Sequence, residues 1–144
     1  MGELSSAQLI VYIADAYVKL GNNSKARTLL EKALMIQENH YGTRKHIVIA
    51  NTLSTVGQVY MQLGDVNKAM DILEEALTIQ GEYYGTDKNI EVTFTMSRLG
   101  KAYIQLGDYN KARVLLEKSL VFQESYYGPN NPEFADILIA LAKL

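Results

Sequence analysis

Few residues of this chain have the types and spacing that catalysis or metal binding requires. Its two histidines, His40 and His46, lack the i, i+4 spacing and the nearby acidic partner of a helical zinc site. The absence of cysteine removes thiolate ligands, cysteine nucleophiles and disulfides, and it fits a reducing, cytoplasmic compartment. The adjacent acids Glu74 and Glu75 fall on a solvated helical face rather than beside a cleft. We therefore expect no enzyme activity, no metal and no cofactor.

Charge and polarity argue against two further classes of protein. A formal net charge of −2 at pH 7 is unlike that of a nucleic-acid binder, which needs a basic face to meet the phosphate backbone. The uncharged stretch 47–64 contains six serine, threonine, asparagine or glutamine side chains, which would be costly to place in hydrocarbon. We expect neither a nucleic-acid partner nor a membrane.

A pattern of fifteen residues that occurs three times organises the chain. Each copy begins with leucine-glycine and continues with lysine-alanine and a leucine-rich stretch, and its glycine is Gly21, Gly64 or Gly107. These glycines recur every 43 residues. Self-similarity at such a period indicates an array of units, each of which buries its apolar face against its neighbours. The sequence therefore predicts an elongated stack with one continuous core.

Apolar periodicity predicts two helices in each unit. After Gly64, the residues Ala69, Ile72, Leu73 and Ala76 follow at the spacing of one stripe along an α-helix. The stretch before each glycine has a similar helical spacing, and nothing in the sequence indicates a strand. We predict an all-α fold whose helices cover about 5–20, 23–41, 46–62, 66–84, 89–105, 109–127 and 132–143.

The residues between the two helices of a unit are typical of helix ends. The three glycines of the pattern suit the left-handed conformation that ends a helix. Asn22 or Asn23, Asp65 and Asp108 are good N-caps for the helix that follows. A tyrosine-glycine pair then ends the second helix of each unit. We therefore expect a sharp turn within each unit and a longer loop between units.

The repeated residues resemble the signature of the tetratricopeptide repeat. In the second unit the residues that match that signature are Leu53, Val56, Gly57, Tyr60, Gly64, Ala69, Leu73 and Ala76. The units exceed the usual length of about 34 residues, and their long second helix and loop are similar to those of kinesin light chains and many bacterial repeat proteins. The resemblance implies an α-solenoid of stacked antiparallel helix pairs. Its single array over 1–144 would contain units at about 5–41, 46–84 and 89–127 and a terminal helix at 132–143.

The resemblance also implies a concave surface lined by the first helix of each unit. The positions that match this lining hold amides, hydroxyls and apolar groups, which can bind a peptide backbone and receive apolar side chains. The candidate partner-binding residues are Tyr12, Asp15, Asn51, Ser54, Gln58, Met61, Gln62, Phe94, Ser97, Arg98, Lys101, Gln105 and Asp136. The same transfer places Ile104, Ile139 and Lys143 on this surface. The implied function is to bind a short peptide or helix of a partner protein, and the alternative is a structural spacer or self-assembling scaffold segment without a groove ligand.

The charge of the lining suggests a charge for the ligand. Arg98 and Lys101 lie in the middle of the implied groove, and the lining residues of the second and third units include no acid. An acidic segment or a C-terminal carboxylate would suit these cations. The alternative is that both side chains extend into water or pair with acids of a neighbouring helix.

The terminal helix leads to an expectation about association. We align Ala135, Leu138, Leu141 and Ala142 with the inward-facing positions of the second unit, which leaves Ile137, Ile139 and Leu144 on the outside. Terminal units of natural arrays usually present a polar outer face. We therefore expect either a longer array or end-to-end association with another copy of the chain.

Overall fold

The computed structural model describes residues 2–86, 88–128, 130 and 132–144, with the backbone alone at 133 and 134. This part of the chain forms seven helices and no strand. They are α1 (Glu3–Lys19), α2 (Asn23–Tyr41), α3 (Ile47–Gln62), α4 (Val66–Tyr84), α5 (Ile90–Leu106), α6 (Tyr109–Tyr127) and α7 (Pro132–Ala142). Every predicted helix is confirmed, with bounds that agree to within two residues. None of the described helices is long and apolar enough to cross a membrane.

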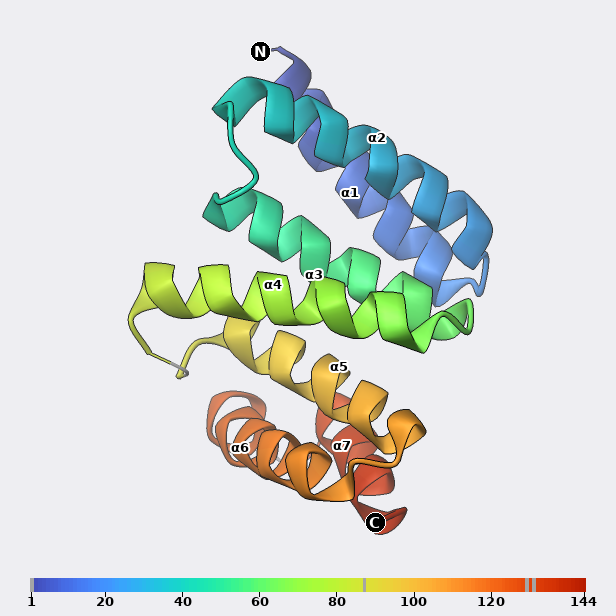
Figure 1. Ribbon diagram of the computed structural model, residues 1–144, viewed down its shortest axis with the longest axis vertical. Coiled ribbons are helices and arrows are strands. Elements are labelled where there is room, and N and C mark those ends of the chain that lie inside the picture. Colours follow the sequence, from blue (N-terminus) through green and yellow to red (C-terminus); the bar gives the residue numbers. More distant parts are fainter. Residues whose placement is uncertain (1, 87, 129, 131) are drawn as a thin grey trace.

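The helices stack as pairs along the long axis of the molecule (Figure 1). The pairs α1 with α2, α3 with α4 and α5 with α6 follow one another, and α7 packs against α6 at the far end. Each second helix also contacts the first helix of the next pair, and α3 lies against α5. The predicted all-α solenoid is confirmed.

The turn within each unit has the predicted chemistry. Gly64 has a φ of +88°, in the left-handed region that a residue without a Cβ adopts at little cost. The Asp65 N–H donates to the Tyr60 carbonyl at 2.9 Å, so one of the last carbonyls of α3 is satisfied. The Asp65 carboxylate accepts a bond from the Lys68 N–H at 3.3 Å and caps α4. The other two turns repeat this arrangement, with Asn22 and Asp108 as caps.

The core depends on a close approach of two helices at Gly57. A Cβ added to this glycine would lie 2.5 Å from the Leu73 side chain, which is fully buried. Gly100 approaches Leu116 in the same way, at 2.8 Å. Glycine at this position therefore allows the two helices of a unit to pack tightly around a leucine. The first unit has Ala14 there, so its two helices accommodate a Cβ.

Side-chain contacts also connect consecutive units. The Tyr60 hydroxyl donates to Glu31 of the preceding unit at 3.4 Å, and the Tyr103 hydroxyl donates to Glu74 at 2.6 Å. In the loop after α2, the Arg44 guanidinium donates to both carboxylate oxygens of Glu75 on α4, at 2.7 and 3.2 Å. Such forked pairing restricts the geometry of the loop relative to the next unit.

The predicted orientation of α7 was wrong. Ile137 is fully buried with Ala140 and packs on Leu116 of α6, whereas Leu138 is exposed. Ala135 and Ala142, which were also expected to face inward, are exposed, and Leu141 is half-buried. In the sequence, the two prolines of the chain follow the third unit, the second of them being the first residue of α7, and the constant spacing of the earlier units does not extend across this stretch. Because a shift of one or two residues rotates a helix by 100° or 200°, a different set of side chains meets the core.

Candidate partner-binding groove

The helices α3, α5 and α7 line a cavity of about 330 Å³, which we call the groove. Its lining residues are Gln58, Met61 and Gln62 from α3, Arg98, Lys101, Ile104 and Gln105 from α5, and Asp136, Ile139, Ala140 and Lys143 from α7. All of them except Ala140 were placed on the concave surface by the resemblance. The structure therefore brings together seven of the candidate partner-binding residues.

Helical spacing and the repeat together position the groove residues. Gln58, Met61 and Gln62 lie at i, i+3 and i+4, so they share one face of α3. Lys101, Ile104 and Gln105 occupy the corresponding face of α5, 43 residues later. In both α3 and α5, these three positions therefore hold a polar residue, an apolar residue and a glutamine. This arrangement extends amide and apolar contacts along the row of first helices.

The groove contains more positive than negative charge. Its lining includes the three cations Arg98, Lys101 and Lys143 and the single acid Asp136. The Lys101 ammonium pairs with the Asp136 carboxylate, so α5 and α7 are linked across the groove. For Lys101, pairing with an acid of a neighbouring helix is therefore the observed arrangement. Counted over its lining, the groove keeps an excess of cations over acids.

A hydrogen-bonded network beneath the groove orients Arg98. The hydroxyls of Ser54 and Thr95 lie 2.7 Å apart across the contact between α3 and α5. Arg98 Nη1 donates to the Ser54 hydroxyl oxygen at 2.8 Å, and its guanidinium lies 5.9 Å from the centre of the Phe94 ring. Because Ser54 is buried, it supports Arg98 from below and does not line the groove.

The other candidate residues lie outside the groove. Ser97 is fully buried, and the Asn51 side chain accepts a hydrogen bond from Gln80 Nε2 at 3.0 Å. Phe94 stacks on Tyr127 with ring centres 6.5 Å apart. On α1, Tyr12 is exposed, and Asp15 forms an ion pair with Lys19 at 3.4 Å. The structure therefore separates these five residues, and Ser54, from the seven that the cavity brings together.

Sequence reasoning missed a set of buried glutamines. Gln37, Gln80 and Gln123 are almost completely buried near the ends of the second helices. They recur every 43 residues, so their repetition was a signal that could have identified them as part of the core. Gln80 shows the consequence, because it fixes the Asn51 side chain of α3 in place.

His46 has a structural role in the contact between the first two units. Its Nδ1 accepts a hydrogen bond from the Val48 N–H at 3.1 Å and caps α3. The ring also stacks on Tyr41, with centres 3.6 Å apart. Among the described residues, no group of three or more histidines, aspartates or glutamates is arranged to hold a metal ion.

Comparison with known proteins places the chain among repeat proteins. The model of the tetratricopeptide repeat family matches residues 5–82 and 48–120, while no curated protein matches. A putative kinesin light chain with nearly identical TPR-like repeats from Podosopora anserina has a similar structure, with a TM-score of 0.80, 22% identity, and coverage of 99% of this chain and 67% of that one. BtubC from P. vanneervenii has a TM-score of 0.74 and 23% identity over 94% of this chain and 53% of its own.

A third similar structure is the complex of the TPR2AB domain of yeast Sti1 with pHSP90. It has a TM-score of 0.61 and 21% identity, and the match covers 96% of this chain and 48% of that one. This chain thus spans about two thirds of the kinesin light chain structure and about half of the other two. Likeness at these identities shows a shared fold, and the family model matches most of the chain. The chain therefore belongs to the tetratricopeptide repeat family.

Proposed function

We propose that the groove binds an acidic peptide segment, or a C-terminal carboxylate, of a partner protein in the cytoplasm. The observation that supports this proposal is the excess of cations over acids in the groove of a chain with net negative charge. Tetratricopeptide repeats generally mediate protein–protein interaction. One of the similar solved structures is itself a complex with a protein partner, pHSP90.

The uncharged groove residues suit an extended peptide. Gln58, Gln62 and Gln105 offer amide donors and acceptors, which can hydrogen-bond the peptide backbone. Between them, Met61 and Ile104 supply apolar contacts for alternate peptide side chains. The groove thus combines backbone recognition, apolar contact and charge, which are the three components of peptide binding.

In the proposed complex, the Asp136 carboxylate competes with a carboxylate of the peptide for Lys101. A peptide carboxylate that reaches Lys101 must share or displace the Asp136 carboxylate. The Asp136 side chain is 52% exposed, and exposed ion pairs contribute only about 0–1 kcal/mol. Displacement is therefore inexpensive, and removal of Asp136 should favour an acidic ligand.

Fluorescence anisotropy with defined peptides tests the proposal. The probes are a fluorescein-labelled octapeptide of alternating glutamate and leucine with a free C-terminus, its C-terminal amide, and the same peptide with lysine in place of glutamate. We expect binding in the order acid, amide, lysine, with affinity that falls as salt is added. If none of the peptides binds at low salt, the groove has no affinity for this class and the spacer function is favoured.

Two sets of variants separate groove binding from general electrostatics. The double variant Arg98→Glu with Lys101→Glu should weaken binding and flatten its salt dependence. The matched control, Arg27→Glu with Lys32→Glu on α2, makes the same change in net charge outside the groove and should bind like the parent. Asp136→Asn should tighten binding, a gain that partial unfolding cannot produce.

A further inference from the structure

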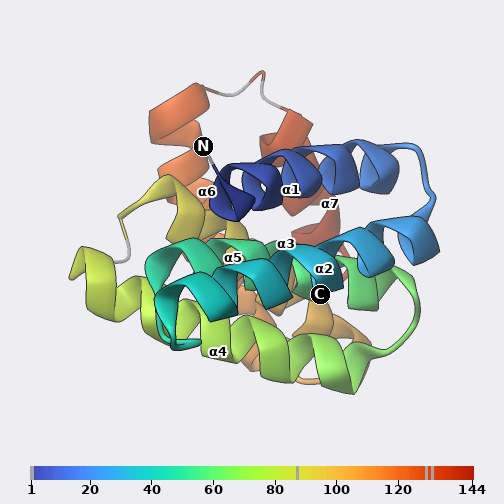
Figure 2. The ribbon, with the colours of Figure 1, turned by 90° about the horizontal axis from the view of Figure 1, so that it is seen from above.

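Arg98 stands at the end of a chain of three hydrogen bonds that starts in the backbone of α5 and passes through α3. The Thr95 hydroxyl donates to the Glu91 carbonyl, one turn earlier in α5, at 3.1 Å. Ser54 Oγ of α3 lies 2.7 Å from Thr95 Oγ1, and Arg98 Nη1 donates to Ser54 Oγ at 2.8 Å. Both hydroxyls are buried where α3 and α5 lie against each other, and the two helices overlap in the view along the stack (Figure 2). The chain thus connects a groove cation to the interior contact between two units.

The direction of this chain follows from the number of hydrogens on each group. A carbonyl oxygen only accepts, so the bond to Glu91 uses the single hydroxyl hydrogen of Thr95. The Ser54 hydroxyl must therefore donate to Thr95, which turns the lone pairs of Ser54 Oγ towards Arg98. Hydrogen bonds that point the same way along a chain polarise and strengthen one another. Ser54 is therefore a fixed acceptor for the guanidinium.

Only the first bond of the chain belongs to the repeating frame. At the matching position 43 residues earlier, the Thr52 hydroxyl makes the same bond to a carbonyl of its own helix. The positions that match Ser54 and Arg98 hold Val11 and Thr55, and valine has no hydroxyl to complete the chain. A residue that stacking requires recurs from unit to unit. The other two bonds, which occur beside the groove, are therefore not explained by stacking.

The support for Arg98 differs from that of the neighbouring groove cation, Lys101. Lys101 pairs with the Asp136 carboxylate, which offsets its charge. Ser54 is neutral, so it orients the guanidinium without bringing a negative charge to it. The Phe94 ring, 5.9 Å away, adds a second contact that carries no formal charge. An arginine that is already oriented loses less conformational entropy when it binds a carboxylate.

We propose that Ser54 and Thr95 are positioning residues that act through Arg98 and make the groove select a carboxylate over a carboxamide. This inference rests on the proposed function, because it assigns recognition of the peptide carboxylate to one of the groove cations. The ion pair between Lys101 and Asp136 then links α5 to α7 and contributes little to the selection. The ligand is a peptide that places a carboxylate on Arg98, from an acidic side chain or from its C-terminus.

Fluorescence anisotropy with three labelled octapeptides measures the selection and identifies the source of the carboxylate. Each alternates with leucine: glutamate with a C-terminal amide, glutamine with a free C-terminus, and glutamine with a C-terminal amide. Their carboxylates are therefore on side chains, at the terminus, or absent. The parent should prefer the first or the second peptide over the third. Ser54→Ala should lower that preference about fivefold, which corresponds to the ordering of one long side chain.

Ser97→Ala is the matched control for Ser54→Ala. Ser97 occupies the same position in the next unit and is also buried, but its hydroxyl has no hydrogen-bond partner among the described residues. This variant should select like the parent. Thr95→Ser, which keeps the hydroxyl, should also select like the parent, whereas Thr95→Val should lower the preference. Equal effects of Ser54→Ala and Ser97→Ala would overturn the inference.

A double-mutant cycle shows whether Ser54 acts through Arg98. In the Arg98→Ala background, Ser54→Ala should have no further effect on the preference. Lys101→Met combined with Asp136→Asn removes the ion pair without a change in net charge and should retain most of the preference. If the preference persists in Arg98→Ala, or vanishes with the ion pair, the assignment to Arg98 is wrong.

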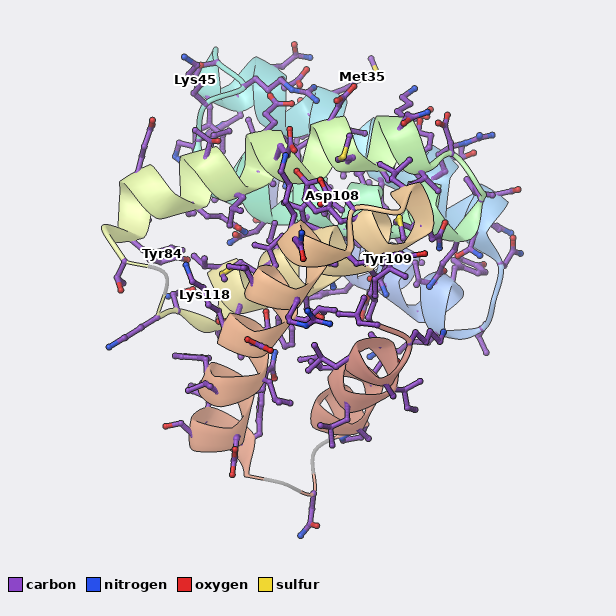
Figure 3. All side chains as sticks on the ribbon, turned by 60° about the horizontal axis from the view of Figure 1, so that its bottom comes forward. Met35, Lys45, Tyr84, Asp108, Tyr109 and Lys118 are labelled. Atoms are coloured by element: carbon purple, nitrogen blue, oxygen red, sulfur yellow. The ribbon has the colours of Figure 1, made fainter. Side chains whose placement is uncertain are left out.

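The side-chain NMR signals of Arg98 report its orientation without any ligand. A guanidinium held by a hydrogen bond rotates slowly, so its Nη–H signals should be resolved at low temperature in the parent and in Ser97→Ala but averaged in Ser54→Ala. Met35 on α2 is 65% exposed and points away from the stack in Figure 3, so Met35→Ala gives the variation expected of an unrelated change. Identical Arg98 signals in Ser54→Ala and Ser97→Ala would exclude the positioning role.

The preference of the parent chain separates a failure of the proposed function from a failure of this inference. If the parent binds neither carboxylate peptide more tightly than the third peptide, the proposed function fails, and the selection assigned to Ser54 fails with it. If the parent has the preference and Ser54→Ala keeps it in full, the proposed function stands and the positioning role is wrong.

Discussion

The first helix pair and the second are built on the same pattern but differ in their surroundings. Val56 of α3 is buried against the preceding pair, whereas Ile13, at the corresponding position of α1, is half exposed. Complete burial of a large aliphatic side chain contributes roughly 1.5–3 kcal/mol. The same position in the repeat therefore contributes different amounts to stability, because in a stacked array each unit depends on its neighbours for burial.

The two pairs also differ in how closely their helices approach. At Gly57 the helices of the second unit meet around Leu73 with no room for a methyl group, while Ala14 of the first unit is fully buried and accommodated. The second unit has neighbours on both sides and the first has one. We infer that the middle of the stack tolerates changes in side-chain volume least, and four predictions test this comparison.

The largest effect is expected for Gly57→Val. The new side chain must displace the buried Leu73, and overpacking of this kind costs about 3 kcal/mol. The contrasting variant Ala14→Gly adds only helix flexibility and a small void, at a cost of about 1 kcal/mol. Urea unfolding followed by circular dichroism gives both free energies of unfolding. Equal costs for the two variants would remove the distinction between the units.

A smaller loss is expected for Gly64→Val. The glycine has a φ of +88° and open space around its missing Cβ, so the cost arises from backbone strain alone, about 1–2 kcal/mol. Gly21→Val places the same strain, at a φ of +82°, next to the terminal pair. Thermal melts should show the greater loss for Gly64→Val, because two neighbouring units depend on that turn. A melting temperature like that of the parent would contradict the role of this turn.

A pH-dependent loss is expected for Tyr103→Phe. Donation of the hydroxyl to Glu74 raises the pKa of Tyr103 to about 12, with a smaller contribution from burial. Because the folded pKa exceeds the unfolded value of about 10, the contribution of this bond is complete below pH 10 and is lost as the pH rises towards 12. The variant should therefore lose about 1 kcal/mol near neutral pH and converge with the parent at high pH.

Tyr60→Phe provides the comparison for that bond. Its hydroxyl donates to Glu31 over a longer distance, 3.4 Å rather than 2.6 Å, and a longer bond is weaker. At neutral pH, the free energy of unfolding should therefore fall by less in Tyr60→Phe than in Tyr103→Phe, because the hydrogen bond that Tyr60→Phe removes is the weaker one. If the gap between parent and Tyr103→Phe persists unchanged near pH 12, the hydroxyl is not the origin of the effect.

The smallest effect on stability is expected for Asp136→Asn. Its ion pair with Lys101 links α7 to α5, but the Asp136 side chain is 52% exposed, so the loss should stay below about 1 kcal/mol. By contrast, Ile137→Ala removes a fully buried side chain from the contact with α6 and should cost about 2 kcal/mol. Hydrogen exchange along α7 compares the two. Similar exchange in both variants would mean that α7 is attached by charge rather than by packing.

Part of the site followed from the sequence because it depends on helix periodicity. Gln58, Met61 and Gln62 share a face of α3 at any orientation of that helix, and the repeat transfers the same face to α5. Ser54 also belongs to a first helix, but it lies on the side where α3 and α5 touch. The contact between these two helices, and hence the burial of Ser54, depends on how far each unit rotates relative to the last.

The sequence by itself determined the period, the helix bounds and the turns, because apolar spacing and capping act between residues a few positions apart. Only the tertiary structure decided that Ile137 faces the core and that Asp136 meets Lys101. Each of these facts relates side chains on different helices. They depend on helix rotation and on the presence of a neighbour, neither of which the local pattern of residues specifies.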